Sequence, residues 1–161
     1  SGFSGSISIA DVDGDGQSEI ATRVGTDLVV LETNGSVRWT ANTGDFTPHS
    51  SGTTTADLDG DGRAEVIHRD GIELRIFDGV DGTVLYRYAA TNGTWTEYAI
   101  PADADGDGRL DVVFQINNGN ENHPDDLEGG YVLVSDPRWA AGRSLWNQYG
   151  YHITNVRCDQ T

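Results

Sequence analysis

Three short acidic segments contain the residues whose types and spacing could do chemistry. Each reads Asp-x-Asp-Gly-Asp-Gly-x-x followed by Asp or Glu, over residues 11–19, 57–65 and 103–111, and consecutive copies lie 46 residues apart. Carboxylates held this close repel one another unless a cation lies among them. Ca²⁺ binds about six to eight hard oxygens, which a loop can supply from side chains at positions 1, 3 and 5 and a carbonyl at position 7. We therefore predict a structural calcium site in each segment.

The ninth residue of each segment would add a closing carboxylate from the start of the next strand. The predicted ligands are Asp11, Asp13, Asp15, the carbonyl of Gln17 and Glu19; Asp57, Asp59, Asp61, the carbonyl of Arg63 and Glu65; and Asp103, Asp105, Asp107, the carbonyl of Arg109 and Asp111. The strand-like flanks exclude a helix–loop–helix calcium loop, and Mg²⁺ is less favoured because it prefers fewer protein ligands. Ordinary polar hairpins would explain Asp-Gly, but not three aspartates with a fixed ninth acid.

The segments that must position these loops are short, and they are rich in β-branched and aromatic residues. Asn-Gly and Asp-Gly pairs separate them, and no stretch has helical periodicity. The expected strands cover 6–9, 19–24, 28–31 and 37–39 in the first unit; 53–55, 65–69, 74–77 and 84–88 in the second; and 111–116 and 131–134 in the third. We predict an all-β chain of three units, each with four short antiparallel strands.

A four-stranded repeat of this length has the size of a β-propeller blade. The predicted blades cover about residues 5–47, 51–94 and 97–156 of a single repeat domain spanning 1–161, and residues 117–130 are expected to form a surface loop. Closed propellers typically need about four to eight blades. We therefore expect further blades from the rest of a longer chain or from partner subunits, an expectation that fits a chain with no Met.

The acidic repeat resembles the FG-GAP/VCBS family of calcium-binding β-propeller repeats, which is found in integrin-like heads, fungal lectins and secreted bacterial proteins. The ending at 143–156 resembles a segment that closes such arrays in bacterial surface proteins. The resemblance implies a non-catalytic extracellular or cell-surface module for adhesion, recognition or assembly. Two alternatives are the blades of a calcium-dependent polysaccharide lyase and the subunit of an extracellular fibre.

Composition excludes several classes of partner. The chain carries 26 acidic and 10 basic residues, a formal net charge of −16, so nucleic acid and anionic lipid surfaces are poor partners. No apolar run is long enough to span a membrane. We find no catalytic Ser/His/Asp arrangement, phosphate-binding loop or activated cysteine, and therefore predict no enzyme.

A few other residues suggest partners or modification. Phe46 and Trp95 lie in connections between units, which together with the 117–130 loop would open on the face opposite the calcium loops and could bind a carbohydrate or a protein. Asn34 and Asn92 fit the N-glycosylation pattern but also suit turns. Cys158, the only cysteine, is expected to be inert or to form an intermolecular bond.

Overall fold

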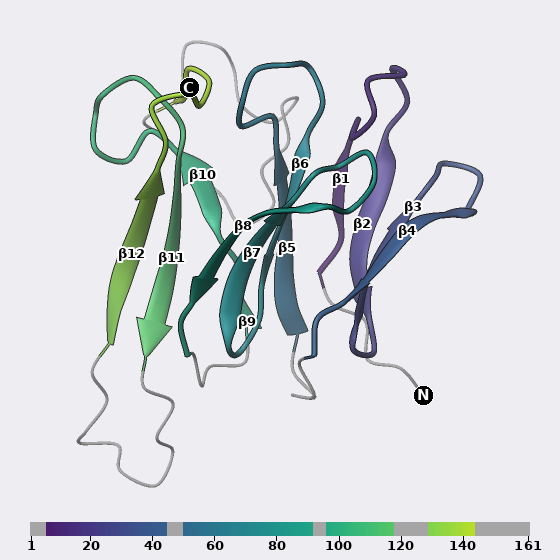
Figure 1. Ribbon diagram of the computed structural model, residues 1–161, viewed down its shortest axis with the longest axis horizontal. Coiled ribbons are helices and arrows are strands. Elements are labelled where there is room, and N and C mark those ends of the chain that lie inside the picture. Colours follow the sequence, from purple (N-terminus) through teal and green to yellow (C-terminus); the bar gives the residue numbers. More distant parts are fainter. Residues whose placement is uncertain (1–5, 45–49, 92–95, 118–128, 144–161) are drawn as a thin grey trace, which may run out of the picture.

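The computed structural model describes residues 6–44, 50–91, 96–117 and 129–143, and these residues form strands and turns without a helix (Figure 1). They make three sheets, which we call the first, middle and third sheets. The strands are β1 (Ser8–Ala10), β2 (Glu19–Val24), β3 (Asp27–Leu31) and β4 (Val37–Asn42); β5 (Ser50–Ala56), β6 (Glu65–Arg69), β7 (Glu73–Phe77) and β8 (Val84–Ala89); and β10 (Ile100–Ala102), β11 (Asp111–Asn117) and β12 (Gly129–Ser135). Neighbouring strands within each of these sets are antiparallel and follow chain order.

The prediction of an all-β chain is confirmed, and strand positions agree closely with the sequence pattern. β2 and β6 have the predicted bounds, whereas β4 continues to residue 42 because Ala41 and Asn42 still pair with Leu28 and Asp27. The predicted third unit extends to residue 156, and its part beyond residue 143 lies outside the described residues. No membrane-spanning helix occurs in the described part of the chain.

The sequence did not locate β10, the first strand of the third sheet, or one further strand. β9 (Thr96–Glu97) adds a short parallel pairing to the start of β5, next to the otherwise antiparallel middle sheet. The sequence carries no signal for it, because two residues are too few for periodicity and the pairing joins distant parts of the chain. The pairing attaches the segment before the third sheet to the middle sheet.

The core consists of two apolar layers, one on each side of the middle sheet. The layer between the first and middle sheets contains Val12, Ala21, Leu28, Val30, Trp39, Ala64, Val66 and Phe77. The layer between the middle and third sheets contains Leu58, Ile67, Leu74, Ile76, Ala99, Val112, Phe114 and Val134. Because side chains alternate across a strand, the middle sheet sends one set to each layer. β6 is accordingly buried along its whole length.

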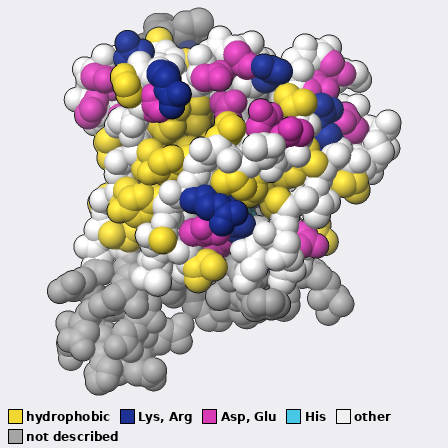
Figure 2. Space-filling model, viewed as in Figure 1, with side chains coloured by type: hydrophobic (Ala, Val, Ile, Leu, Met, Phe, Trp, Pro, Cys, Tyr) yellow, Lys and Arg dark blue, Asp and Glu magenta, His cyan; other side chains and the backbone are white. Residues whose placement is uncertain are grey.

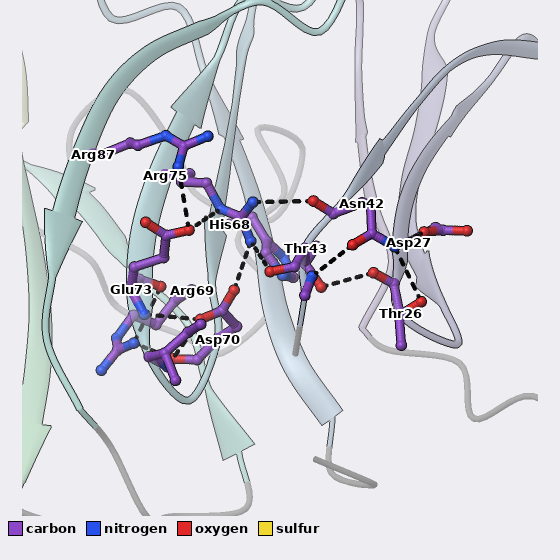
Figure 3. Close-up of polar contacts among 12 residues, drawn as sticks. Thr26, Asp27, Asn42, Thr43, His68, Arg69, Asp70, Glu73, Arg75 and Arg87 are labelled. Atoms are coloured by element: carbon purple, nitrogen blue, oxygen red, sulfur yellow. Dashed lines mark hydrogen bonds and ion pairs between the residues drawn. The ribbon is translucent and has the colours of Figure 1, made fainter. Parts of the chain in front are cut away.

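A buried ion pair lies in the middle sheet at the end where the β6–β7 turn is found, and its arginine also bonds to the first sheet (Figure 3). Arg75 Nη2 donates to Asp70 Oδ2 at 2.8 Å, and both side chains are almost completely buried. The same guanidinium donates to the carbonyls of Asn42 and Thr43, at 3.2 and 2.8 Å. The other oxygen of Asp70 accepts from the backbone N–H groups of the turn. Arg75 therefore fastens the end of β4 to the middle sheet.

Candidate metal centres

The three acidic loops lie at one end of the three sheets. Each connects the first and second strands of its sheet, and acidic side chains gather along that edge of the molecule (Figures 1 and 2). In the first two loops the carboxylates at positions 1, 3 and 5 converge, as the sequence predicts. Ligand oxygens of the following aspartates lie within 4.8 Å of one another in each loop: Asp11, Asp13 and Asp15, and Asp57, Asp59 and Asp61.

The first aspartate of each loop holds the turn in place by hydrogen bonds, without any bound ion. Asp11 accepts from the backbone N–H of Gly14 at 2.7 Å with one oxygen and from that of Gly16 at 2.9 Å with the other. Both glycines have φ near +80°, a backbone conformation that costs a side-chain-bearing residue energy. Asp57 and Asp103 make the equivalent pairs of bonds in the other loops. The glycines are therefore required by the turn that brings the aspartates together.

The ninth residue of each loop is a buried brace. Glu19 Oε2 accepts from the N–H of Val12 at 2.9 Å, and Glu65 Oε2 accepts from the N–H of Leu58 at 2.7 Å. Both glutamates lie outside the three-aspartate groups, although the sequence placed them among the ligands. Glu19 is 1% exposed, and its second oxygen, Oε1, is buried without a hydrogen-bond partner. That oxygen is available to a cation.

The third loop differs from the other two. Here the ninth residue, Asp111, joins Asp103 and Asp105 in the group, and Asp107 lies outside it. Asp111 is held from two sides: Oδ2 accepts from the N–H of Ala104 at 2.8 Å, and Oδ1 accepts from Ser135 Oγ at 2.5 Å. The three loops thus share a fold but not an identical arrangement of carboxylates. The predicted carbonyl ligands, from Gln17, Arg63 and Arg109, remain predictions.

Burial and repulsion destabilise the charged form of the bracing glutamates. Burial, together with the nearby charges of Asp59 and Asp57, raises the pKa of Glu65 to about 7, although the bond from Leu58 opposes this. Burial and the charge of Asp13 likewise raise the pKa of Glu19. A cation among the aspartates would reverse both effects, because an adjacent positive charge favours the ionised carboxylate.

Two arginine side chains for which the sequence analysis predicted no role pair with carboxylates of the loops and partly neutralise their charge. Arg38 Nη1, from β4, lies 2.7 Å from Asp13 Oδ2 and 2.9 Å from Glu32 Oε1. In the second loop the guanidinium of Arg63 pairs with Asp61, although only its carbonyl was predicted to matter. No sequence signal could identify Arg38, because it is not at an equivalent position in the other units. Even with these pairs, each loop carries an excess of negative charge.

Other predicted sites are placed only in part. Asn34 is exposed, and its Oδ1 accepts from the N–H of Ser36 at 2.8 Å, so its side chain stabilises a turn. Phe46, Asn92, Trp95, Cys158 and most of the 117–130 loop lie outside the described residues.

Comparisons with known proteins identify the fold. No family model matches the chain, and no curated protein matches its sequence. Among solved structures, the V. cholerae biofilm matrix protein Bap1 superposes with a TM-score of 0.71 and 22% sequence identity. The match covers 89% of this chain and 24% of Bap1, so the chain spans about a quarter of that protein's length. At this identity the likeness shows a shared fold.

Proposed function

We propose that this chain is a calcium-stabilised repeat module of β-propeller type from a secreted or cell-surface protein. Its role would be adhesion, recognition or matrix assembly rather than catalysis. The observation that carries this proposal is the recurrence, at one end of all three sheets, of three carboxylates whose oxygens lie within 4.8 Å of one another. Such a grouping is costly without a cation, and its all-oxygen ligands suit a hard ion such as Ca²⁺.

The second support for a bound ion is the unpaired oxygen of Glu19. A carboxylate oxygen buried without a partner costs free energy, and a bound cation would supply the missing interaction. Asp11, Asp13 and Asp15 would hold the ion directly, with Glu19 beneath them, and the equivalent residues would serve the second loop. In the third loop the direct ligands would be Asp103, Asp105 and Asp111.

The calcium would stabilise the packing of sheets as well as individual hairpins. The N–H of Ala64, in the second loop, donates to the carbonyl of Asp11, in the first, at 2.9 Å. The second loop is similarly linked to the segment after β12, where the N–H of Ala140 donates to the carbonyl of Leu58 at 2.6 Å. An ion that orders one loop therefore also orders its contact with the next sheet.

The arrangement of sheets supports assignment of the units as propeller blades. The first and middle sheets each contain four antiparallel strands in chain order, and successive sheets pack face to face. The blades proposed here are those predicted above, and further blades would complete the array. The likeness to Bap1, described as a biofilm matrix protein, supports an extracellular role. Exposed loops of this kind suit extracellular calcium concentrations, at which modules with Kd near 10⁻⁴–10⁻³ M are occupied.

A non-catalytic role is favoured by the way in which charged groups outside the loops are used. Two of the buried ones, Asp70 and Arg75, bond to each other. Arg75 also donates to backbone carbonyls and Asp70 accepts from backbone N–H groups, as in a structural pair. A carbohydrate or protein ligand on the face opposite the calcium loops stays a prediction, because Phe46 and Trp95 lie outside the described residues.

Calorimetric titration of the chelator-treated chain with Ca²⁺ tests the proposal. We expect saturable binding at three sites, with Mg²⁺ as the matched control giving weaker or no binding. A variant carrying Asp57→Asn should lose one site and keep two. Absence of Ca²⁺ binding at millimolar concentration would contradict the proposed function.

A further inference from the structure

The two sheet junctions in this chain are built from the same positions of the repeat. Paired residues form rows across each sheet, and we name two of them. Row a is Ala21, Val30 and Trp39 in the first sheet and Ile67, Ile76 and Tyr86 in the middle sheet. Row b is Val66, Phe77 and Val84 in the middle sheet and Val112 and Val134 in the third. At both junctions, row a of one sheet packs against row b of the next.

Among the residues that the structure describes, no sheet packs against row b of the first sheet. Its members pair across all four strands and are all large and apolar: Ile9, Ile20, Leu31 and Val37. On its two central strands Ile20 and Leu31 are half-buried, whereas their equivalents in the middle sheet, Val66 and Phe77, are at most 1% exposed. On its edge strands Ile9 is 58% exposed and Val37 is 60% exposed, whereas Val84, the equivalent of Val37, is half-buried.

The third sheet has the complementary bare face. Its row a is Ile100, Val113 and Leu133. Leu133 is 44% exposed, whereas its equivalents Val30 and Ile76 are buried. Beside this row, Tyr131 pairs with Gln115 and is 80% exposed, although Leu28 and Leu74 at the same repeat position are fully buried.

We propose that row b of the first sheet binds row a of the third sheet of a second copy of this chain. The two bare faces are the two halves of a junction that the chain already makes twice, and both are apolar along the whole row. A contiguous exposed apolar patch marks an interaction surface, and here two patches of matching type lie at opposite ends of the stack. This inference names the partner for the assembly role in the proposed function and rests on that role.

The contact is head-to-tail, because it joins different faces of the two copies. Head-to-tail contacts leave one free face of each kind at the ends, so copies add until a ring closes or a filament grows. This geometry separates the proposal from a symmetric dimer, in which the same face of both copies would be buried. It can also be distinguished by experiment from non-specific association, which would not depend on these two faces.

The test is sedimentation velocity of the full chain in calcium over a wide range of concentration, with two variants. One carries Tyr131→Glu and Leu133→Glu on the third sheet, and the other carries Ile9→Glu and Val37→Glu on the first. All four positions are exposed, so the fold should persist, and melting curves check this. Leu85→Glu is the matched control, since Leu85 is also exposed, at 55%, but lies in the middle sheet.

We expect the wild-type chain and the Leu85 variant to associate as concentration rises, and each double variant alone to stay monomeric. An equimolar mixture of the two double variants should form a dimer, because each retains the face that the other has lost. A monomeric wild-type chain, association in either double variant alone, or no dimer in the mixture would overturn the proposal. The proposal would also be overturned if a neutral polysaccharide bound the monomeric wild-type chain but not the variant with Tyr131→Glu, because the face of the third sheet would then bind carbohydrate.

The same samples separate this inference from the proposed function. Association in calcium without any calcium-dependent change in melting would overturn the calcium module and uphold the junction. Calcium-dependent melting in a strictly monomeric chain would uphold the calcium module and overturn the junction.

Discussion

The two ends of the middle sheet organise buried and clustered charge in opposite ways. At one end, the loop over 57–65 gathers carboxylates of like charge, and their neutralising partners are backbone N–H groups and a single arginine. At the other end, beyond β6, Asp70 lies 2.8 Å from Arg75, so charge is balanced within the chain. Under the proposed function the first arrangement would bind an external cation, whereas the second is balanced without one. The proposal therefore predicts that the fold depends on calcium at one end only.

Removal of calcium is the sharpest way to test this difference and should have the largest effect. In calcium at about 100 times the Kd, on the order of 10–100 mM for the affinities given above, each site contributes roughly 2.7 kcal/mol and three sites on the order of 8 kcal/mol. At about 2–4 °C per kcal/mol for a chain of this size, the melting temperature should fall by roughly 20 °C in excess chelator. Differential scanning calorimetry measures this, and magnesium added back should not restore it. An unchanged melting curve would show that the acidic end is also independent of ions.

Loss of the ion pair at the other end of the sheet should lower the free energy of unfolding by a smaller amount, and this decrease should not depend on calcium. Arg75→Met leaves Asp70 buried without its partner, which we expect to lower the free energy of unfolding by about 3–5 kcal/mol. Urea denaturation with and without calcium should give the same difference. Arg87→Met is the matched control, because Arg87 is largely exposed and 3.8 Å from Glu73, and it should cost at most about 1 kcal/mol. A cost that disappears in chelator would link the two ends and contradict their independence.

Asp57→Asn tests a single acidic loop. The amide retains one oxygen for the loop but removes a charge from the cluster, so the second site should no longer bind calcium. In chelator we expect a loss of about 1 kcal/mol, because either Gly60 or Gly62 loses the acceptor for its N–H. In calcium the loss should be roughly 2–3 kcal/mol larger, because the ion no longer binds. Thermal melting of both states measures this. Asp81→Asn, in the exposed turn before β8, is the control and should behave as wild type in calcium. Equal destabilisation in both states would mean that Asp57 acts only through its hydrogen bonds.

The smallest expected effect concerns Arg38, which supplies the first loop with internal charge balance. Arg38 holds Asp13 and Glu32, so Arg38→Met should cost about 1 kcal/mol in chelator. In calcium the cost should shrink, because the ion replaces the arginine beside Asp13. Titration calorimetry should therefore show tighter binding at one of the three sites. Weaker binding at that site would instead assign Arg38 a role in positioning Asp13 for the ion.

Much of the fold and of the site can be predicted from short-range patterns. The nine-residue acidic repeat identifies three loops, and the pattern of strand-forming and turn residues locates the strand after each loop, β2 and β6 at their observed bounds, and the strand before the first two. These features depend on contacts between residues close in the chain, such as Asp11 with Gly14 and Gly16. Local hydrogen bonding and side-chain periodicity are expressed directly in sequence.

The sequence by itself determined an all-β repeat with three clusters of carboxylates at a fixed spacing. Only the tertiary structure decided that Glu19 and Glu65 brace the loops, that Asp111 replaces Asp107 in the third cluster, and that Arg38 reaches Asp13. It also decided the pairing of Asp70 with Arg75 and the parallel contact of β9 with β5. These arrangements depend on burial and on contacts between strands, sheets or distant segments, which no spacing along the chain records. The same is true of the faces left bare at the two ends of the stack.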